Sequence, residues 1–173
     1  GLWMRAHGLW QDYDGDRDMA GSKLSGDALT IGADTRLKND WVVGVSFSAG
    51  RTNLEFDGID DDGYARGRAI GAYAGFTSGA WTYRGHLAYA WYDNRMEREV
   101  VVGALRNTAK SDFDSHSILV HGEASVDLPM GGWTLQPLFG VQVLHARSEG
   151  FTEKGAGGLN LKVDADRSTS VRT

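Results

Sequence analysis

The stretch Trp81–Trp91, WTYRGHLAYAW, divides its side chains into two kinds by alternate position. The odd positions carry Trp, Tyr, Gly, Leu, Tyr and Trp, whereas the even positions carry Thr, Arg, His and two Ala. Successive side chains of a strand point to opposite faces, so the stretch predicts a strand with one apolar and one polar face. Aromatic rings stand at both ends of the apolar face, and a strand crossing a bilayer needs about 9–11 residues. We therefore interpret the stretch as one strand of an outer-membrane β-barrel.

The composition is compatible with this interpretation. The 173 residues include 24% charged residues, 24 glycines, 2 prolines and no cysteine, and their mean hydropathy is −0.36. A barrel wall gives a low mean because half of each strand faces a polar lumen. Abundant glycine with little proline suits twisted strands that need their N–H groups. The absence of cysteine excludes disulfides and thiolate metal sites, and a net charge of −5 argues against a nucleic-acid partner.

Seven further segments repeat the alternation. With the first stretch, extended to Tyr92, they predict an all-β, antiparallel, up-and-down transmembrane barrel with about eight strands present. The seven segments are residues 2–12, 29–37, 41–48, 70–76, 118–128, 133–144 and 159–166.

The connections between these segments alternate in length. Three are predicted as tight turns: Lys38-Asn39-Asp40, Ser78-Gly79-Ala80 and Met130-Gly131-Gly132. Others are longer and polar: Tyr13–Ser25, Asp57–Gly63 and Asp93–Lys110. Short turns on the periplasmic side and long loops outside are typical of outer-membrane barrels. A soluble sandwich has no reason to sort its loops in this way. The sorting predicts that the first segment runs from the periplasm to the exterior.

Two sets of candidate functional residues follow from the alternation. The first is expected to face the lumen as an electrostatic lining for a polar plug or a passing polypeptide: Arg5, Asp34, Arg36, Arg84, His86, His121 and Glu123. For any single member we favour a simpler role, hydration and cross-strand ion pairs worth about 0.2–1 kcal/mol each. The second is expected to form an aromatic girdle at the membrane boundaries: Trp41, Trp81, Tyr83, Tyr89, Trp91 and Trp133.

The sequence predicts no catalytic, cofactor or metal site. The acidic run Asp12, Asp14, Asp16 and Asp18 invites comparison with a calcium-binding loop. An EF-hand loop needs Gly at its sixth position and Glu at its twelfth. Here Gly15 falls at the fourth position and Lys23 at the twelfth. The run is therefore interpreted as part of a solvated external loop.

Six short motifs, in this order and spacing, resemble one known family. They are Leu2–Ala6 (LWMRA), Tyr13–Asp16 (YDGD), Leu29–Asp34 (LTIGAD), Tyr73–Phe76 (YAGF), Leu161–Asp164 (LKVD) and Ser170–Thr173 (SVRT). Together they make nearly the whole chain similar to the N-terminal two-thirds of the translocator β-domain of autotransporters, the type V secretion systems of Gram-negative bacteria.

The resemblance implies a twelve-stranded outer-membrane barrel whose lumen holds a helix joined to a secreted passenger. Residues 1–173 would then be a partial barrel domain, strands one to eight, without the plug helix and the C-terminal strands. The implied partners are outer-membrane lipid, the chain's own passenger and plug helix, the C-terminal strands and the barrel-assembly machinery. Eight strands of twelve leave two edges whose backbone groups lipid cannot satisfy. We expect further strands or a partner barrel to pair with them, with a self-closed eight-stranded barrel as the alternative.

Two other functions remain as alternatives to a non-enzymatic translocator. An outer-membrane barrel enzyme of protease or lipase type would gather acids and histidines at the extracellular ends of its strands, whereas His86 and His121 are predicted mid-strand. A soluble ligand-binding β-barrel would dissolve without detergent.

Overall fold

The computed structural model describes residues 1–15, 21–38, 40–57 and 61–173. Its main feature is one antiparallel sheet of eight strands that follow each other in chain order. This confirms the predicted all-β, up-and-down architecture. The strands are β1 (Leu2–Tyr13), β2 (Ser22–Arg36), β3 (Val42–Phe56), β4 (Asp62–Ser78), β5 (Trp81–Val102), β6 (Leu105–Val126), β9 (Leu138–Ser148) and β12 (Asp166–Arg172).

The remaining elements are short and lie in the connections. They are β7 (Leu128–Met130), β8 (Trp133–Leu135), β10 (Phe151–Thr152), β11 (Lys162–Val163) and a 3₁₀ turn, η1 (Gly157–Leu159). β7 pairs with β8, and β10 pairs with β11. None of the helices formed by the described residues has the length and apolarity to cross a membrane.

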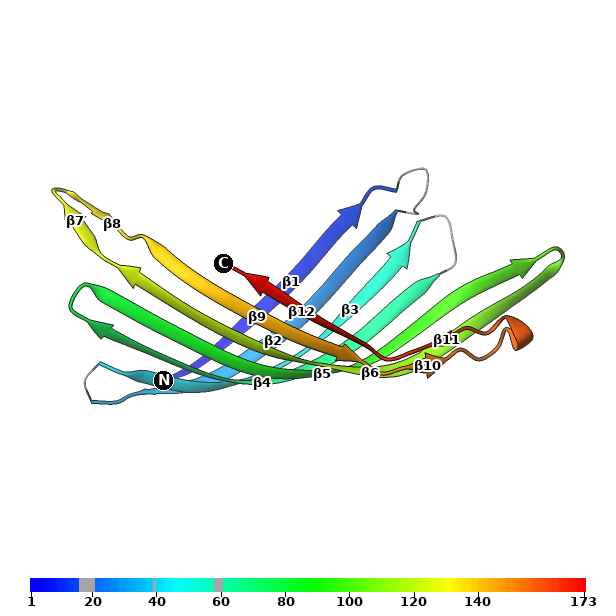
Figure 1. Cartoon of the computed structure of the whole chain (residues 1–173), viewed down its shortest axis with the longest axis horizontal. Helices are drawn as coiled ribbons and strands as arrows, with labels where there is room; N and C mark the ends of the chain where they lie inside the picture. The colour runs from blue at the N-terminus through cyan, green and yellow to red at the C-terminus, as the bar shows by residue number, and fades with distance from the viewer. Residues whose placement is uncertain (16–20, 39, 58–60) are drawn as a thin grey trace.

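The sheet is open, with β1 and β12 at its two edges. In the described part of the chain β1 pairs with β2 alone and β12 with β9 alone. The alternative of a self-closed eight-stranded barrel is therefore wrong for this structure. Figure 1 shows the strands as one curved and twisted wall, coloured from blue β1 to red β12.

The register divides the sheet into two faces. His86 on β5 pairs directly with Tyr73 on β4 and with His121 on β6. Directly paired residues point to the same side of a sheet, and alternate residues along a strand share a side. We call the side of His86 the polar face and the side of Leu87 the apolar face. Every side chain of the eight strands belongs to one of the two.

The predicted loop Asp93–Lys110 is wrong, because these residues continue β5 and β6 as a hairpin. The two strands pair from Trp81↔Val126 to Val102↔Leu105, and Gly103 turns the chain with a φ of 61°. Cross-strand ion pairs replace hydrophobic alternation here: Arg95–Asp112 at 2.9 Å, Lys110–Glu97 at 2.8 Å and Arg106–Glu99 at 2.8 Å. These charged side chains occupy the continuation of the apolar face, so the apolar periodicity that indicates a strand ends before the hairpin. Figure 1 shows this hairpin reaching beyond its neighbours.

The predicted strand at residues 159–166 is also wrong, and the eighth strand of the sheet is β12. Leu159 ends the 3₁₀ turn η1, and the backbone N–H of Leu161 donates a 2.8 Å hydrogen bond to the carboxylate of Glu153. These local bonds draw the segment into the β9–β12 connection. Its alternation, LNLKVD, imitates a strand without making a ladder in the main sheet.

The other connections follow the expected alternation with changes of length. Gly79, with a φ of 60°, makes the predicted tight turn between β4 and β5. The turn at Gly131 is the tip of the β7–β8 hairpin, so the predicted seventh segment is divided between β8 and β9. Tyr13 pairs with Ser22, which shortens the first predicted loop. Residues 16–20, 39 and 58–60, which belong to predicted connections, lie outside the described residues.

Candidate functional site

All seven residues predicted to line a lumen lie on the polar face of the sheet. They come from four strands: Arg5 on β1, Asp34 and Arg36 on β2, Arg84 and His86 on β5, and His121 and Glu123 on β6. A hollow of about 690 Å³ on this face is lined by Arg36, Arg84, His86, His121 and Glu123, together with Tyr73. Arg5 stands apart from this group, opposite Thr30 on the β1–β2 pair.

A chain of hydrogen bonds connects Asp34 across three strands. The indole N–H of Trp3 donates to the Tyr73 hydroxyl at 2.7 Å, and that hydroxyl donates to the Asp34 carboxylate at 3.0 Å. The tyrosine ring lies over Gly44, where an added Cβ would be 2.2 Å from its Cζ atom. Trp3 covers Gly32 in the same way, again at 2.2 Å. The glycines therefore make room for the aromatic rings that hold Asp34 in place.

Tyr73 and Trp3 were missing from the predicted set of lining residues. The signal for Tyr73 was present in the sequence, because it alternates with outward-facing Ala72 and Ala74. Tyr73 reaches Asp34 because it is paired with Gly44 in the register of β3 and β4, and the sequence pattern does not define that register.

The second group on the polar face is built on the β5–β6 pair. Arg84 donates a 2.5 Å hydrogen bond to Glu123, its direct register partner. His121 Nε2 lies 3.5 Å from the other oxygen of Glu123, and His86 is directly opposite His121. Within the described residues, the buried Nδ1 of His121 has no hydrogen-bond partner. The group offers the guanidinium of Arg84, the carboxylate of Glu123 and two imidazoles as hydrogen-bonding groups on the polar face.

The opposite face of the sheet is apolar and uncovered. Eight of its large apolar side chains are between 42% and 89% exposed: Leu2, Met4, Ile31, Val45, Phe47, Ile70, Leu87 and Val120. A monomeric water-soluble protein rarely exposes a continuous apolar surface of this extent. This face therefore needs an apolar environment.

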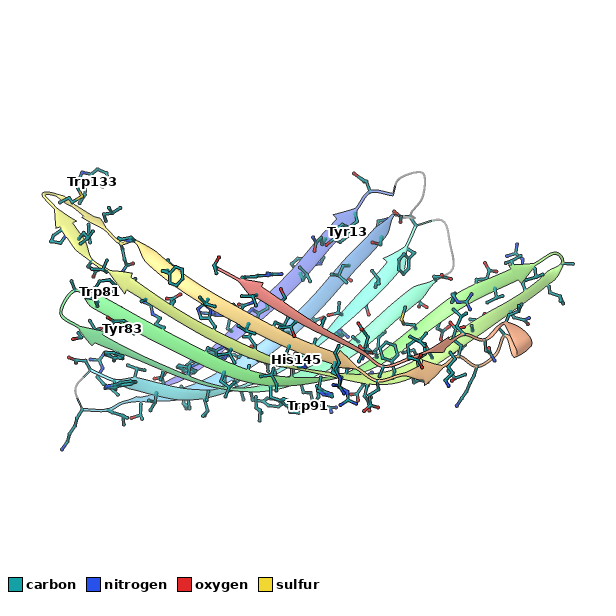
Figure 2. The ribbon with its side chains drawn as sticks, viewed as in Figure 1. Tyr13, Trp81, Tyr83, Trp91, Trp133 and His145 are labelled. Atoms are coloured by element: carbon teal, nitrogen blue, oxygen red, sulfur yellow. The ribbon has the colours of Figure 1, made fainter. Side chains whose placement is uncertain are left out.

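Aromatic rings edge the apolar face at one end. Trp41 stacks on Phe76 with centroids 4.5 Å apart, Phe76 stacks on Tyr83 at 4.8 Å, and Tyr83 lies 6.1 Å from Trp81. Phe76 was missing from the predicted girdle, although its alternation already placed it outward. Figure 2 shows Trp81 and Tyr83 near the start of β5 and Trp91 well along the strand.

The second aromatic group lies ten residues further along β5. Tyr89 is 6.0 Å from Trp91 and 6.2 Å from His116, measured between ring centroids. Ten residues of strand span about 33 Å, which a tilt of about 40° reduces to a height of about 25 Å. That height matches the hydrocarbon thickness crossed by outer-membrane barrels. Trp133 does not belong to either group, since it lies 83% exposed at the tip of the β7–β8 hairpin.

Beyond the second aromatic group, a segment that we call the strap, residues 149–161, packs on the β5–β6 hairpin. Arg98 donates two hydrogen bonds to Glu153, at 3.1 and 2.7 Å. Lys110 and Lys154 exchange backbone hydrogen bonds of 2.8 and 2.9 Å. Ala156 is buried against Val100 and Ala109, and Phe151 stacks on Phe113 at 4.6 Å. The strap and the hairpin thus form one packed unit.

This unit is expected to loosen in acid. The guanidinium of Arg98 holds the pKa of Glu153 below its ordinary value of 4.5, and the Leu161 N–H bond acts in the same direction. Because the pKa is lower when the strap is docked, the carboxylate stabilises docking above pH 4.5 and this contribution is lost as pH falls through the lowered pKa. Hydrogen–deuterium exchange at Lys110, Lys154 and Leu161, corrected for intrinsic rates, should accelerate over that interval.

Glu153→Gln provides the matched test at neutral pH, because it removes the charge and keeps the size. A hydrogen bond to a charged group contributes about 1.5–3 kcal/mol, so we expect exchange in the strap to accelerate at least about tenfold. Unchanged protection in this variant, or strap protection that does not respond to acid in the parent protein, would contradict the assignment of Glu153 as the residue that holds the strap.

The described residues contain no group of three or more His, Cys, Asp or Glu side chains that could hold a metal ion. Asp16 and Asp18 of the predicted acidic loop lie outside those residues.

Comparison with known sequences identifies one family and several relatives. A family model described as the autotransporter β-domain matches residues 2–173. An extracellular serine protease of Serratia marcescens is 25% identical over 164 residues, which are 95% of this chain and 16% of that protein. Esterase EstA of Pseudomonas aeruginosa is 25% identical over 180 residues, covering 95% of this chain and 28% of the esterase. The chain therefore spans less than a third of the length of these relatives.

Comparison with solved structures gives the same fold. The translocator domain of autotransporter NalP from Neisseria meningitidis matches with a TM-score of 0.78 and 15% identity, over 98% of this chain and 57% of that chain. The β-domain of the Bordetella autotransporter BrkA matches with a TM-score of 0.68 and 19% identity, over 98% of this chain and 66% of that chain.

Proposed function

The chain belongs to the autotransporter β-domain family, and from this premise we propose that it forms part of an outer-membrane wall through which a passenger polypeptide is anchored and helped to the cell surface. The single observation that carries the proposal is the two-faced sheet. One face is apolar, uncovered and edged by aromatic rings about 25 Å apart in height, while the other carries a hydrogen-bonded polar lining.

The apolar face supplies the anchor. Its side chains would replace lipid–lipid contacts in the bilayer, and the ladders of the sheet satisfy the backbone of every interior strand. The stacked rings of Trp41, Phe76 and Tyr83 would lie at the periplasmic boundary, and those of Tyr89 and Trp91 at the outer boundary. In this orientation β1 runs outward, and the strap and the β5–β6 hairpin are extracellular.

The polar face supplies the lumen. Asp34 is held by Tyr73, and Glu123 by Arg84, so both carboxylates keep fixed positions in a wet interior. The hollow lined by Arg36, His86 and Tyr73 offers hydrogen-bonding groups to a polar occupant. We propose that this occupant is a segment joined to the passenger, such as a plug helix.

The two sheet edges require partners in the bilayer. β1 and β12 each present a row of unpaired N–H and C=O groups, and lipid cannot satisfy them at a cost of several kcal/mol per group. We propose that further strands, delivered with the help of the barrel-assembly machinery, complete the wall. The share of NalP and BrkA that this chain covers, 57% and 66%, supports a partial barrel.

The proposed role needs no catalysis by this chain. The protease and esterase names belong to relatives of which the chain matches 16% and 28%. His86 and His121 are opposite each other on β5 and β6, in the stretch between the two aromatic groups, rather than gathered with acids at the extracellular rim.

Photo-crosslinking in the full-length protein tests the proposal directly. A photoreactive phenylalanine analogue replaces His121 on the polar face, or its neighbour Val120 on the apolar face as the matched control. We expect the passenger-linked segment to crosslink from position 121 and not from position 120. Equal crosslinking from both positions, or crosslinking from position 120 alone, would contradict the assignment of the two faces.

A further inference from the structure

A row of basic side chains borders the apolar face at its outer end. In the register, Trp91 on β5 pairs with His116 on β6, His116 pairs with Arg147 on β9, and Arg147 pairs with Arg167 on β12. These four side chains therefore lie side by side on the apolar face, across four neighbouring strands. On the other side of Trp91 the row continues to Arg68 on β4.

The row lies at the point where each strand stops being apolar. On β9 the outward side chains are Phe139, Val141 and Val143 before His145 and Arg147 follow. Moving towards the outer end of β6, Val120 and Ile118 come before His116 on the apolar face. On β12, Arg167 is the outermost side chain of this face. His145, labelled with Trp91 in Figure 2, hydrogen-bonds to Thr169 at 2.9 Å. The histidines and arginines thus follow directly on the apolar surface.

Two of the three arginines in this row, Arg147 and Arg167, differ from most others in the strands. The third, Arg68, lies 4.0 Å from the carboxylate of Asp93. Arg51 is paired with Asp27 at 2.8 Å, and Arg95 with Asp112 at 2.9 Å. In the part of the chain that the structure describes, no ion pair involves Arg147 or Arg167, and both side chains are exposed. The next row outward on this face holds two acids, Asp93 and Asp114, which pair with each other in the register. Arg147 and Arg167 are therefore open to an anion from outside.

From this arrangement we infer that Arg147 and Arg167, flanked by His116 and His145, bind the phosphate of a lipid headgroup in the outer leaflet. The ligand must be anionic at the level of the row and apolar directly below it, and a phosphate-bearing lipid has both properties. Guanidinium groups bind phosphate through two parallel hydrogen bonds. The inference rests on the proposed function, because it requires the apolar face to lie in a bilayer.

Native mass spectrometry of the full-length protein in detergent tests this inference. The probes are bisphosphorylated lipid A, its dephosphorylated counterpart and inorganic phosphate. The parent protein is expected to bind the phosphorylated lipid at least about tenfold better than the dephosphorylated one. Arg147→Gln with Arg167→Gln should reduce this preference to within about threefold. The matched control, Lys154→Gln with Lys162→Gln, removes two exposed charges outside the row and should leave the preference unchanged.

Heat-modifiable migration on unboiled gels is measured in the same samples to establish that each variant forms a barrel. A folded parent without preference for the phosphorylated lipid would overturn the inference and leave the proposed function standing. The same holds if the glutamine pair retains the preference, or if millimolar inorganic phosphate displaces the lipid. A parent protein that never forms a heat-modifiable barrel would overturn the proposed function and, with it, the inference.

Discussion

Replacing Leu87 with arginine is expected to destabilise the barrel by about 2–4 kcal/mol, the cost of a basic side chain on the lipid face near the bilayer midplane. Leu87 is 53% exposed on the apolar face, midway between the two aromatic groups of β5. Its environment would be hydrocarbon, which cannot solvate a guanidinium. The measurement is the urea midpoint of the heat-modifiable form of the full-length protein in vesicles.

The matched control for this substitution is Ala88→Arg. Ala88 is the next residue of β5 and points to the polar face, which we propose is wet. We expect the control to lower stability by less than about 1 kcal/mol, since lumen substitutions change selectivity rather than insertion. Equal losses for the two arginine variants, or a larger loss for Ala88→Arg, would show that the faces have been assigned the wrong way round.

The second large effect is expected from Gly44→Ala. An added Cβ at Gly44 would lie 2.2 Å from Cζ and 2.4 Å from the hydroxyl oxygen of Tyr73, so the tyrosine must move and release Asp34. Overpacking of this kind costs about 1–3 kcal/mol. Gly122→Ala is the matched control, because its Cβ would meet open space.

A double-mutant cycle identifies the cause of the Gly44 effect. If the clash with Tyr73 is responsible, Gly44→Ala should cause little destabilisation in a Tyr73→Ser background. The double variant should then be less destabilised than the sum of the single variants. Strict additivity would mean that Gly44 is needed for another reason, such as the conformation of β3.

The sequence contained enough to predict the sheet wherever one face is apolar. Trp81–Trp91 was predicted as a strand from alternation alone, and the structure confirms it. The same principle fails beyond Trp91, where the continuation of the apolar face carries Arg95, Glu97 and Glu99. Those strands are stabilised by cross-strand ion pairs, and a pair is visible only when its partner strand and register are known.

The sequence predicted on which face of the sheet the candidate site residues lie, but it did not predict the contacts between them. The alternation placed Asp34 and Glu123 on the side that they occupy. It could not reveal the hydrogen bond from Tyr73 to Asp34, because these residues are 39 positions apart and meet through the register of three strands. The wrongly predicted strand at residues 159–166 has a related cause. The backbone N–H of Leu161 donates a hydrogen bond to Glu153, and the alternation of side chains contains no information about that bond.

Spin-label accessibility along β5 tests the central claim, that the apolar face lies in lipid and the polar face in water. The sequence has no cysteine, so single cysteines at positions 81–91 of the full-length protein each carry one label. In reconstituted vesicles we predict that odd positions collide with oxygen and even positions with a water-soluble nickel complex, alternating along the whole stretch. Uniform access of the nickel complex, or alternation of the opposite sense, would contradict the account.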